Sequence, residues 1–207
     1  MTNPDVKGLE NFIVNLLRRD LNKDLFYHNV DHPLDVRDEA LVLAKMEGLH
    51  DYEIFALEPA ALTHDLGFLV RYKDNEEVGE ILAQEYLPQF GYDQNQSQFI
   101  SEMIPSTKMP QKPKTHIDKI LCDADLANLG REDFYIKTEL LRRELSTMGI
   151  QNFSPRQWYE GTLKLLEDHT YWTKSARNLW QPTKERHIIE IKQLLGDRSL
   201  PYGEYDC

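Results

Sequence analysis

The sequence contains few cysteines, no long apolar run and no excess of basic residues. Its two cysteines, Cys122 and Cys207, are too few for a disulfide framework, which favours a reducing, cytoplasmic location. No stretch approaches the length of a membrane span, and Met1 to Glu10 lacks the apolar region of a secretion signal, so we expect no membrane partner. The 35 acidic residues outnumber the 24 Lys and Arg and leave a net charge of −11, so bulk nucleic acid is not an expected partner.

Patterns typical of β-structure are also missing. No segment alternates apolar and polar residues convincingly, and no Asn-Gly or Asp-Gly pair marks a hairpin turn. Apolar residues instead recur at spacings of three and four, with proline and glycine between the periodic segments. The pattern predicts an all-α fold, a helical bundle of about eight to ten helices. We expect a single domain over residues 1–197 and a loosely ordered tail over residues 198–207.

Four side chains with metal-binding chemistry occur in the order His, His-Asp, Asp. They are His32, the adjacent pair His64 and Asp65, and Asp125. Neutral imidazole and carboxylate are the ligands that hold Mn, Fe, Zn or Mg at an open site that keeps a water. If the fold gathers these four groups, the site can activate water, and the chain would be a hydrolase.

Pro33 indicates where His32 lies. Proline is tolerated in the first turn of a helix, where its missing N–H is not needed, so a helix should begin between Asn29 and His32. Asn29 or Asp31 would cap this helix. His28 lies just before it and four residues from His32, so both imidazoles can point into one cavity.

Gly67 is typical of a helix C-cap, which would place His64 and Asp65 in the last turn of the preceding helix. Their side chains would point about 100° apart and could still converge on one ion. Asp125 ends or interrupts an apolar helical run, where a carboxylate is costly unless it is paired or bound to metal. Asp123 lies two residues earlier, so on a helix its side chain points in a different direction from that of Asp125.

Taken together, these segments resemble the HD-domain superfamily of metal-dependent phosphohydrolases, over roughly residues 27–130. The segment 27–36 resembles the signature of class I cyclic-nucleotide phosphodiesterases, and 62–68 resembles the defining pair of stand-alone bacterial HD proteins. Three further segments resemble other motifs of those bacterial proteins: 74–79, 106–107 and 123–130. The resemblance implies an all-α HD-type domain.

The resemblance also implies roles for individual residues. His32, His64, Asp65 and Asp125 match the ligands of a divalent ion, which could be Mn, Fe, Mg, Zn or Ni. His28 matches the residue that donates a proton to the leaving oxygen in the phosphodiesterases, so His28 and Asp65 are the catalytic candidates.

Phe68 departs from the family patterns. It follows Leu66 and Gly67, where phosphodiesterases carry polar residues for a second metal, and it stands where cyclic-dinucleotide enzymes carry Lys. Both departures argue against a two-metal site. Phe68 also replaces a Glu of the deoxynucleotidase branch, so Glu76 or Glu77 would have to substitute.

Basic residues that could contact a substrate phosphate are Lys108, Arg142 and Arg143, and Glu77 is a further substrate-binding candidate. For each basic residue the alternative is an ordinary solvated surface charge.

The predicted function is metal-dependent hydrolysis of a phosphate ester, with a nucleotide, as phosphomonoester or cyclic phosphodiester, as the expected small-molecule partner. A homodimer is compatible with this interpretation. One alternative is a metal-dependent nucleotide-binding sensor without turnover, because HD domains are sometimes kept as sensors. Another is a structural helical protein whose cluster is fortuitous.

Overall fold

The computed structural model describes residues 4–196, so the tail predicted for residues 198–207 lies outside the described part. Within residues 4–196 the chain forms nine α-helices and four short 3-10 helices and no strand, which confirms the all-α prediction. None of the described helices combines the length and apolar character needed to cross a membrane. The α-helices are α1 (Val6–Asp20), α2 (Asp31–Glu47), α3 (Asp51–Thr63), α4 (Asn75–Tyr86), α5 (Gln94–Ser101), α6 (His116–Asp125), α7 (Phe134–Thr147), α8 (Pro155–Asp168) and α9 (Lys174–Gly196), and the 3-10 helices are η1 (Leu66–Leu69), η2 (Leu87–Phe90), η3 (Ile104–Thr107) and η4 (Ala127–Gly130).

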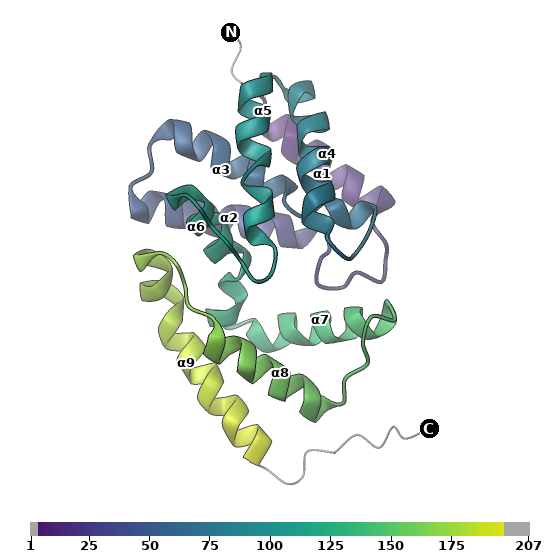
Figure 1. Cartoon of the computed structure of the whole chain (residues 1–207), viewed down its shortest axis with the longest axis vertical. Coiled ribbons are helices and arrows are strands. Elements are labelled where there is room, and N and C mark those ends of the chain that lie inside the picture. The colour runs from purple at the N-terminus through teal and green to yellow at the C-terminus, as the bar shows by residue number, and fades with distance from the viewer. Residues whose placement is uncertain (1–3, 197–207) are drawn as a thin grey trace.

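The helices form two groups around separate apolar clusters (Figure 1). Helices α1 to α6 surround the larger cluster, in which Leu43, Leu57 and Ile120 are completely buried. Ala176 and Trp180, near the start of α9, also belong to it. Helices α7 to α9 lie together at the other end, where Phe134 and Leu166 belong to a smaller cluster. The apolar residues of the helices therefore form two cores, and α9 contributes to both.

Helices α2, α3 and α6 pack against one another in the larger group. Small residues lie buried along them, including Ala40 and Ala44 of α2, Ala60 and Ala61 of α3, and Ala124 of α6. Because the side chains at a contact set the distance between helix axes, alanines let these three backbones approach closely. The close approach brings together the three segments that carry the predicted metal ligands.

Helix α2 begins at Asp31, which confirms the start predicted from Pro33. The predicted cap is wrong, because Val30 occupies the N-cap position and has no side-chain oxygen to offer. Asn29 instead shapes the turn before the helix, since its Oδ1 accepts a hydrogen bond from the backbone N–H of Asp31 at 2.8 Å. The sequence therefore located the helix start correctly but misassigned its cap.

Gly67 is not a helix C-cap, contrary to the sequence prediction. Helix α3 ends at Thr63, His64 is its C-cap, and Gly67 lies inside η1. A Cβ atom added at Gly67 would come within 1.8 Å of the backbone oxygen of Asn75, the first residue of α4. Glycine is needed here because α4 approaches the backbone of η1 too closely for any side chain.

Gly67→Ala should therefore destabilise the protein by about 1–3 kcal/mol or more, because backbone atoms must shift to admit the methyl group. Gly161→Ala is the matched control, since nothing lies within 4 Å of a Cβ added there in α8. Replacing this helical glycine should stabilise the protein by up to about 1 kcal/mol. Denaturant unfolding measures both changes, and equal stabilities for the Gly67 variant and the wild type would contradict the close approach.

Candidate metal centre

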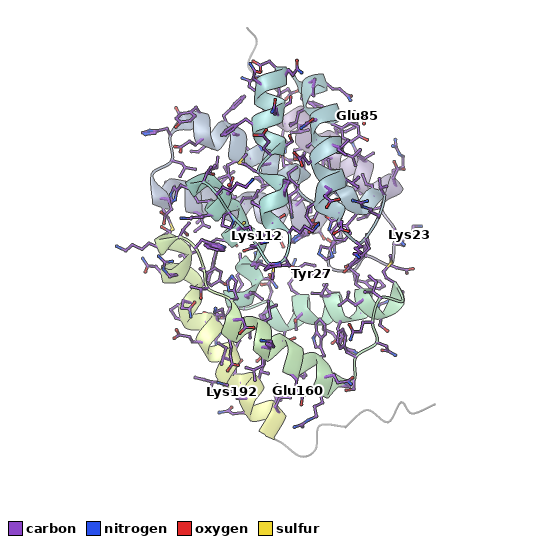
Figure 2. The ribbon with its side chains drawn as sticks, viewed as in Figure 1. Lys23, Tyr27, Glu85, Lys112, Glu160 and Lys192 are labelled. Atoms are coloured by element: carbon purple, nitrogen blue, oxygen red, sulfur yellow. The ribbon has the colours of Figure 1, made fainter. Side chains whose placement is uncertain are left out.

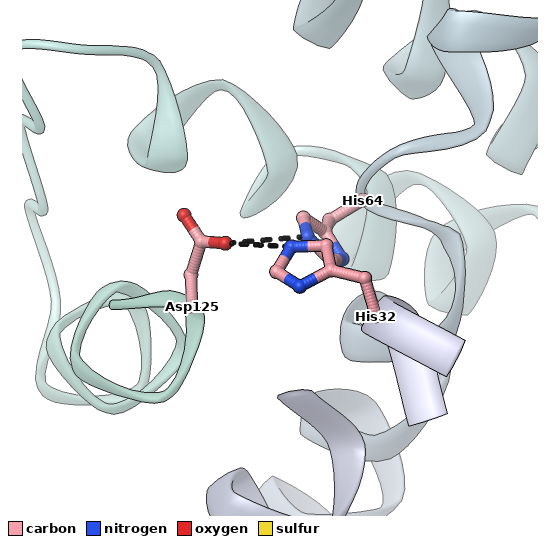
Figure 3. Close-up of side chains that lie close together, drawn as sticks. All are labelled: His32, His64 and Asp125. Carbon is pink, nitrogen blue, oxygen red and sulfur yellow. Dashed lines mark hydrogen bonds and ion pairs between the residues drawn. The ribbon is translucent and has the colours of Figure 1, made fainter. Parts of the chain in front are cut away.

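The fold brings the four predicted ligands together at the ends of three helices. His32 lies in the first turn of α2, His64 caps the C-terminal end of α3 with Asp65 directly after it, and Asp125 is the last residue of α6. His32 Nε2 lies 3.2 Å from Asp125 Oδ1 and 3.3 Å from Asp65 Oδ2. His64 Nε2 lies 3.5 and 3.4 Å from the same two oxygens. Figure 3 shows the two imidazoles facing the Asp125 carboxylate.

The donor atoms in this cluster fit a divalent cation. His64 Nδ1 donates to the carbonyl oxygen of Ala61 at 2.8 Å, which leaves the lone pair of the neutral ring on Nε2. That Nε2 atom and Asp65 Oδ2 are buried and have no hydrogen-bond partner within the described residues. Donors about 2.1 Å from one tetrahedral ion are roughly 3.4 Å apart, which agrees with the spacing of these atoms. A cation between them would satisfy groups that the protein itself leaves unpaired.

The electrostatics of the cluster also favour a positive charge at its centre. Burial alone would lower the pKa of His64, but the carboxylates of Asp65 and Asp125 raise it to about 9. Burial would raise the pKa of Asp125, but the hydrogen bond with His32 and the charges of His32 and His64 outweigh it and hold that pKa well below its usual value. The two carboxylates thus favour a positive charge at this point, and a bound cation would supply it in place of the His64 proton.

His28 lies beside the cluster and does not belong to it. Its ring centroid is 5.8 Å from that of His32, and its ring stacks on Phe68 with centroids 4.2 Å apart. The side chain keeps 18% of its surface exposed, so it remains accessible at the edge of the cluster. The structure therefore places the predicted acid within reach of the site but at a separate position from the predicted ligands.

Glu144 holds His28 in place, and sequence reasoning missed it. This carboxylate on α7 is completely buried and accepts hydrogen bonds from the backbone N–H groups of Tyr27 and His28, at 2.8 and 3.0 Å. His28 Nδ1 lies 2.5 Å from Glu144 Oε1, and the Tyr72 hydroxyl donates to the same oxygen at 2.9 Å. Figure 2 shows Tyr27 where the two groups of helices meet. Nothing local distinguishes Glu144 from other acidic residues of α7, because its partners lie 72 to 117 residues away in the chain.

The Glu144 contact sets the protonation of His28. Burial by itself disfavours the charged imidazole, but the hydrogen bond to Glu144 and the charges of Asp65, Glu144 and Asp125 outweigh it and raise the pKa of His28. The imidazole is therefore held as a proton donor. Because Nδ1 faces Glu144, Nε2 is the nitrogen left to give a proton to another group.

Of the two adjacent glutamates at the start of α4, Glu76 is the one turned toward the cluster. Glu76 is partly buried, and burial together with the charges of Asp65 and Asp125 raises its pKa. Glu77 is exposed and lies 2.9 Å from Arg71 and 3.0 Å from Lys108. Glu76 is therefore better placed than Glu77 to act as the substitute glutamate that the sequence resemblance predicted.

The basic candidates are held by other groups. Lys108 Nζ lies 2.7 Å from Asp74 Oδ1 as well as near Glu77. Arg142 pairs with Glu139 at 2.6 Å, and Arg143 lies over the ring of Phe26 at 3.9 Å. These contacts match the alternative of ordinary surface charges, and none of the three residues contacts the cluster of predicted ligands.

Asp123 and Asp125 have separate partners. Asp123 is completely buried and accepts hydrogen bonds from the backbone N–H groups of Trp172 and Thr173, at 2.7 and 2.8 Å, and from the Thr173 hydroxyl at 2.7 Å. It therefore anchors the start of α9, whereas Asp125 faces the two histidines.

Asp123→Asn should cost about 1–3 kcal/mol of stability and leave metal content unchanged, because an amide turns a donor toward a backbone N–H. Asp125→Asn should remove most bound metal with a smaller effect on stability. Denaturant unfolding and elemental analysis of both purified variants measure these effects. A larger loss of metal at position 123 than at 125 would reverse the assignment.

Comparisons with known proteins bear on the fold. No protein-family model matches the sequence, and no curated protein matches it. The structure is similar to a predicted HD superfamily hydrolase from an uncultured Thermotogales bacterium, with a TM-score of 0.62 and 20% identity over 90% of this chain and 91% of that one. It is also similar to Bacillus subtilis YpgQ, with a TM-score of 0.66 and 21% identity over 94% and 97% of the two chains. A structure of YpgQ in complex with ADP matches with a TM-score of 0.62 and 22% identity over 93% and 98%. The chain therefore shares the all-α fold of these proteins.

Proposed function

We propose that this chain is a metal-dependent phosphohydrolase of the HD superfamily that hydrolyses a phosphate ester, with a nucleotide as substrate. The observation that carries the proposal is the convergence of His32, His64, Asp65 and Asp125 on one point, with buried donor atoms left unpaired. The structural similarity to a predicted HD superfamily hydrolase supports the reaction class. The ADP bound by YpgQ supports a nucleotide as the substrate class.

The four ligands would hold a divalent ion, which when bound lowers the pKa of a water and stabilises negative charge on phosphoryl oxygens. Asp65 or Asp125 would orient the attacking water or accept its proton, since both carboxylates border the same point. His28 would give its Nε2 proton to the leaving oxygen. Glu144 would keep the imidazole oriented and charged for that step.

Room for a substrate exists beside His28. A cavity of about 230 Å³ is lined by Phe68, Arg71 and Tyr72. His28 does not line it, but the rings of Phe68 and Tyr72 contact the His28 imidazole. Arg71 donates to the Asp74 carbonyl and to Glu77, so a phosphate group could compete for it. This cavity is where we expect the substrate to approach the acid.

The alternative function is a metal-dependent nucleotide sensor that does not turn its ligand over. The observation that favours it is the chemistry after the His-Asp pair, where Leu66, Gly67 and Phe68 are buried and offer no side chain to a second ion. Such a protein would hold the metal with the same four ligands and bind a nucleotide at that metal without hydrolysing it. A helical protein with a fortuitous cluster would bind neither.

A substrate screen distinguishes these functions. Purified protein of known metal content is incubated with Mn and with nucleoside monophosphates, triphosphates and cyclic phosphates, and with a generic phosphodiester. We expect turnover of at least one nucleotide class, and none by the His64→Ala variant prepared in the same way. Saturable nucleotide binding without turnover would favour the sensor, and absence of bound metal in the wild type would overturn both.

A further inference from the structure

A second cavity, of about 420 Å³, lies at the C-terminal end of α6. Its walls come from the loop 109–111, the end of α8 and the segment 168–172 before α9. Leu126, the residue that follows α6, completes the wall. Volumes of about 300–1,000 Å³ are typical of sites for small molecules, so the cavity is large enough for a ligand.

This cavity and the metal centre lie on different faces of α6. Asp125 points toward the two histidine ligands, whereas Asp123 accepts hydrogen bonds from Trp172 and Thr173 at the cavity wall. Two residues apart on an α-helix means directions about 200° apart. None of the four predicted metal ligands lines the cavity. Occupancy of this cavity therefore need not involve the proposed reaction.

The wall of the cavity is mainly apolar and aromatic. Tyr171 is completely buried, while Met109 and Trp172 keep 53% and 40% of their surface exposed. The Trp172 indole is held by its Nε1–H, which donates to Gln111 Oε1 at 3.2 Å. A fixed, partly exposed indole beside an apolar cavity offers a stacking surface for a flat ring.

Arg177 supplies a positive charge at this cavity. Its Nη1 donates to the carbonyls of Tyr171 and Trp172, at 2.8 and 2.9 Å, and no carboxylate within the described residues forms an ion pair with it. The acidic residue that lines the cavity, Asp168, is paired with Lys164 at 2.6 Å. The cavity thus combines an apolar wall with a cation whose charge is not neutralised by a direct partner.

His169 contributes a neutral ring to the same wall. Buried Lys184 donates to the His169 carbonyl and lies 3.3 Å from its Nδ1. Burial and the charge of Lys184 lower the pKa of His169 to about 4, so the ring is neutral at pH 7. With Nδ1 accepting from Lys184, the ring proton sits on Nε2, which has no hydrogen-bond partner within the described residues.

We propose that this cavity binds a small aromatic anion, with its flat ring system against Trp172 and the apolar wall and its acidic group at Arg177. The charge complementarity selects an anion over a neutral molecule of the same shape. The site is independent of the proposed phosphohydrolase centre.

Two dyes with the same aromatic body test the proposal. The probe 8-anilinonaphthalene-1-sulfonate carries one negative charge, and N-phenyl-1-naphthylamine lacks it. We expect saturable fluorescence enhancement with the anionic dye and weaker binding of the neutral dye. Arg177→Gln should lower the affinity for the anionic dye by about two- to five-fold, as for a partly exposed ion pair. The affinity for the neutral dye should not change. Arg177→Lys should restore most of the affinity. Arg18→Gln, which removes an exposed charge that has no ion-pair partner within residues 4–196, should have no effect.

A blocking variant locates the binding site. Thr170 is exposed and lines the cavity, so Thr170→Trp should fill the opening and abolish binding of both dyes. Thr147→Trp places the same ring at an exposed position outside the cavity and serves as the control, with circular dichroism checking the fold of each variant. Undiminished dye binding by a folded Thr170→Trp variant, equal losses of both dyes in Arg177→Gln, or absence of saturable binding by the wild type would overturn the proposal. His64→Ala should bind both dyes as the wild type does, which separates this result from any failure of the proposed function.

Discussion

Replacing His28 with alanine should lower kcat by about two to four orders of magnitude, while metal content and substrate affinity stay near wild-type values. The reason is that His28 lies beside the predicted ligands without joining them, and Glu144 holds its ring as a charged donor. Loss of the side chain removes the proton that the leaving oxygen needs in the transition state. Steady-state kinetics and elemental analysis on the same preparation measure both quantities.

The leaving group decides whether His28 acts as an acid. The loss in kcat should shrink for a substrate such as a p-nitrophenyl ester, because that oxygen leaves without a proton. The alkaline fall in wild-type kcat, expected as His28 loses its proton, should also disappear in the variant. His116→Ala is a suitable control, since His116 is exposed and pairs with Glu47. Equal losses for good and poor leaving groups would assign His28 to a metal or phosphate contact instead.

Replacing either His64 or Asp65 with alanine should remove most of the bound metal. Loss of a direct ligand should weaken binding by on the order of 100-fold or more, because substitution of outer groups alone costs about 10- to 100-fold. Asp65→Ala should leave the metal-free protein folded, because Asp65 Oδ2 has no hydrogen-bond partner within the described residues and the variant loses only its ion pairs with His32 and His64. The variant should remain helical and unfold cooperatively.

Elemental analysis and thermal unfolding with and without a chelator measure these effects. In the wild type, chelation should lower Tm, because an ion that binds only the folded state stabilises it. In the Asp65→Ala variant, chelation should change Tm little. Unchanged metal occupancy in both variants would show that the ligand assignment is wrong, and an unfolded Asp65→Ala protein would show that the carboxylate has a structural partner.

Local sequence patterns predicted the helices because each pattern acts within a few residues. The spacing of apolar side chains indicated an all-α fold, and Pro33 located the start of α2, since proline is favoured in the first turn of a helix. The run before Asp125 predicted that this residue ends or interrupts a helix, and Asp125 is the last residue of α6. The sequence therefore identified the order and positions of the groups that gather at the candidate metal centre.

Sequence predictions failed where the role of a residue depends on its contacts with a distant part of the chain. Gly67 was predicted to cap a helix. Glycine is in fact needed at this position because the backbone of Asn75 lies too close for a side chain, and this contact arises from the packing of α4 on η1. Which of Glu76 and Glu77 could replace the glutamate expected at position 68 likewise depends on which face of α4 turns toward Asp65, and the sequence left this open.

Only the tertiary structure decided how the predicted acid is supported and where the second cavity lies. Glu144 is 116 residues from His28, and it becomes a partner because α7 packs against the segment before α2. Asp123 and Asp125 differ by two positions, yet one anchors α9 and the other faces the histidines, because a helix turns successive side chains to different neighbours. Periodicity determines which residues can share a face, but the packing of helices determines what each face meets.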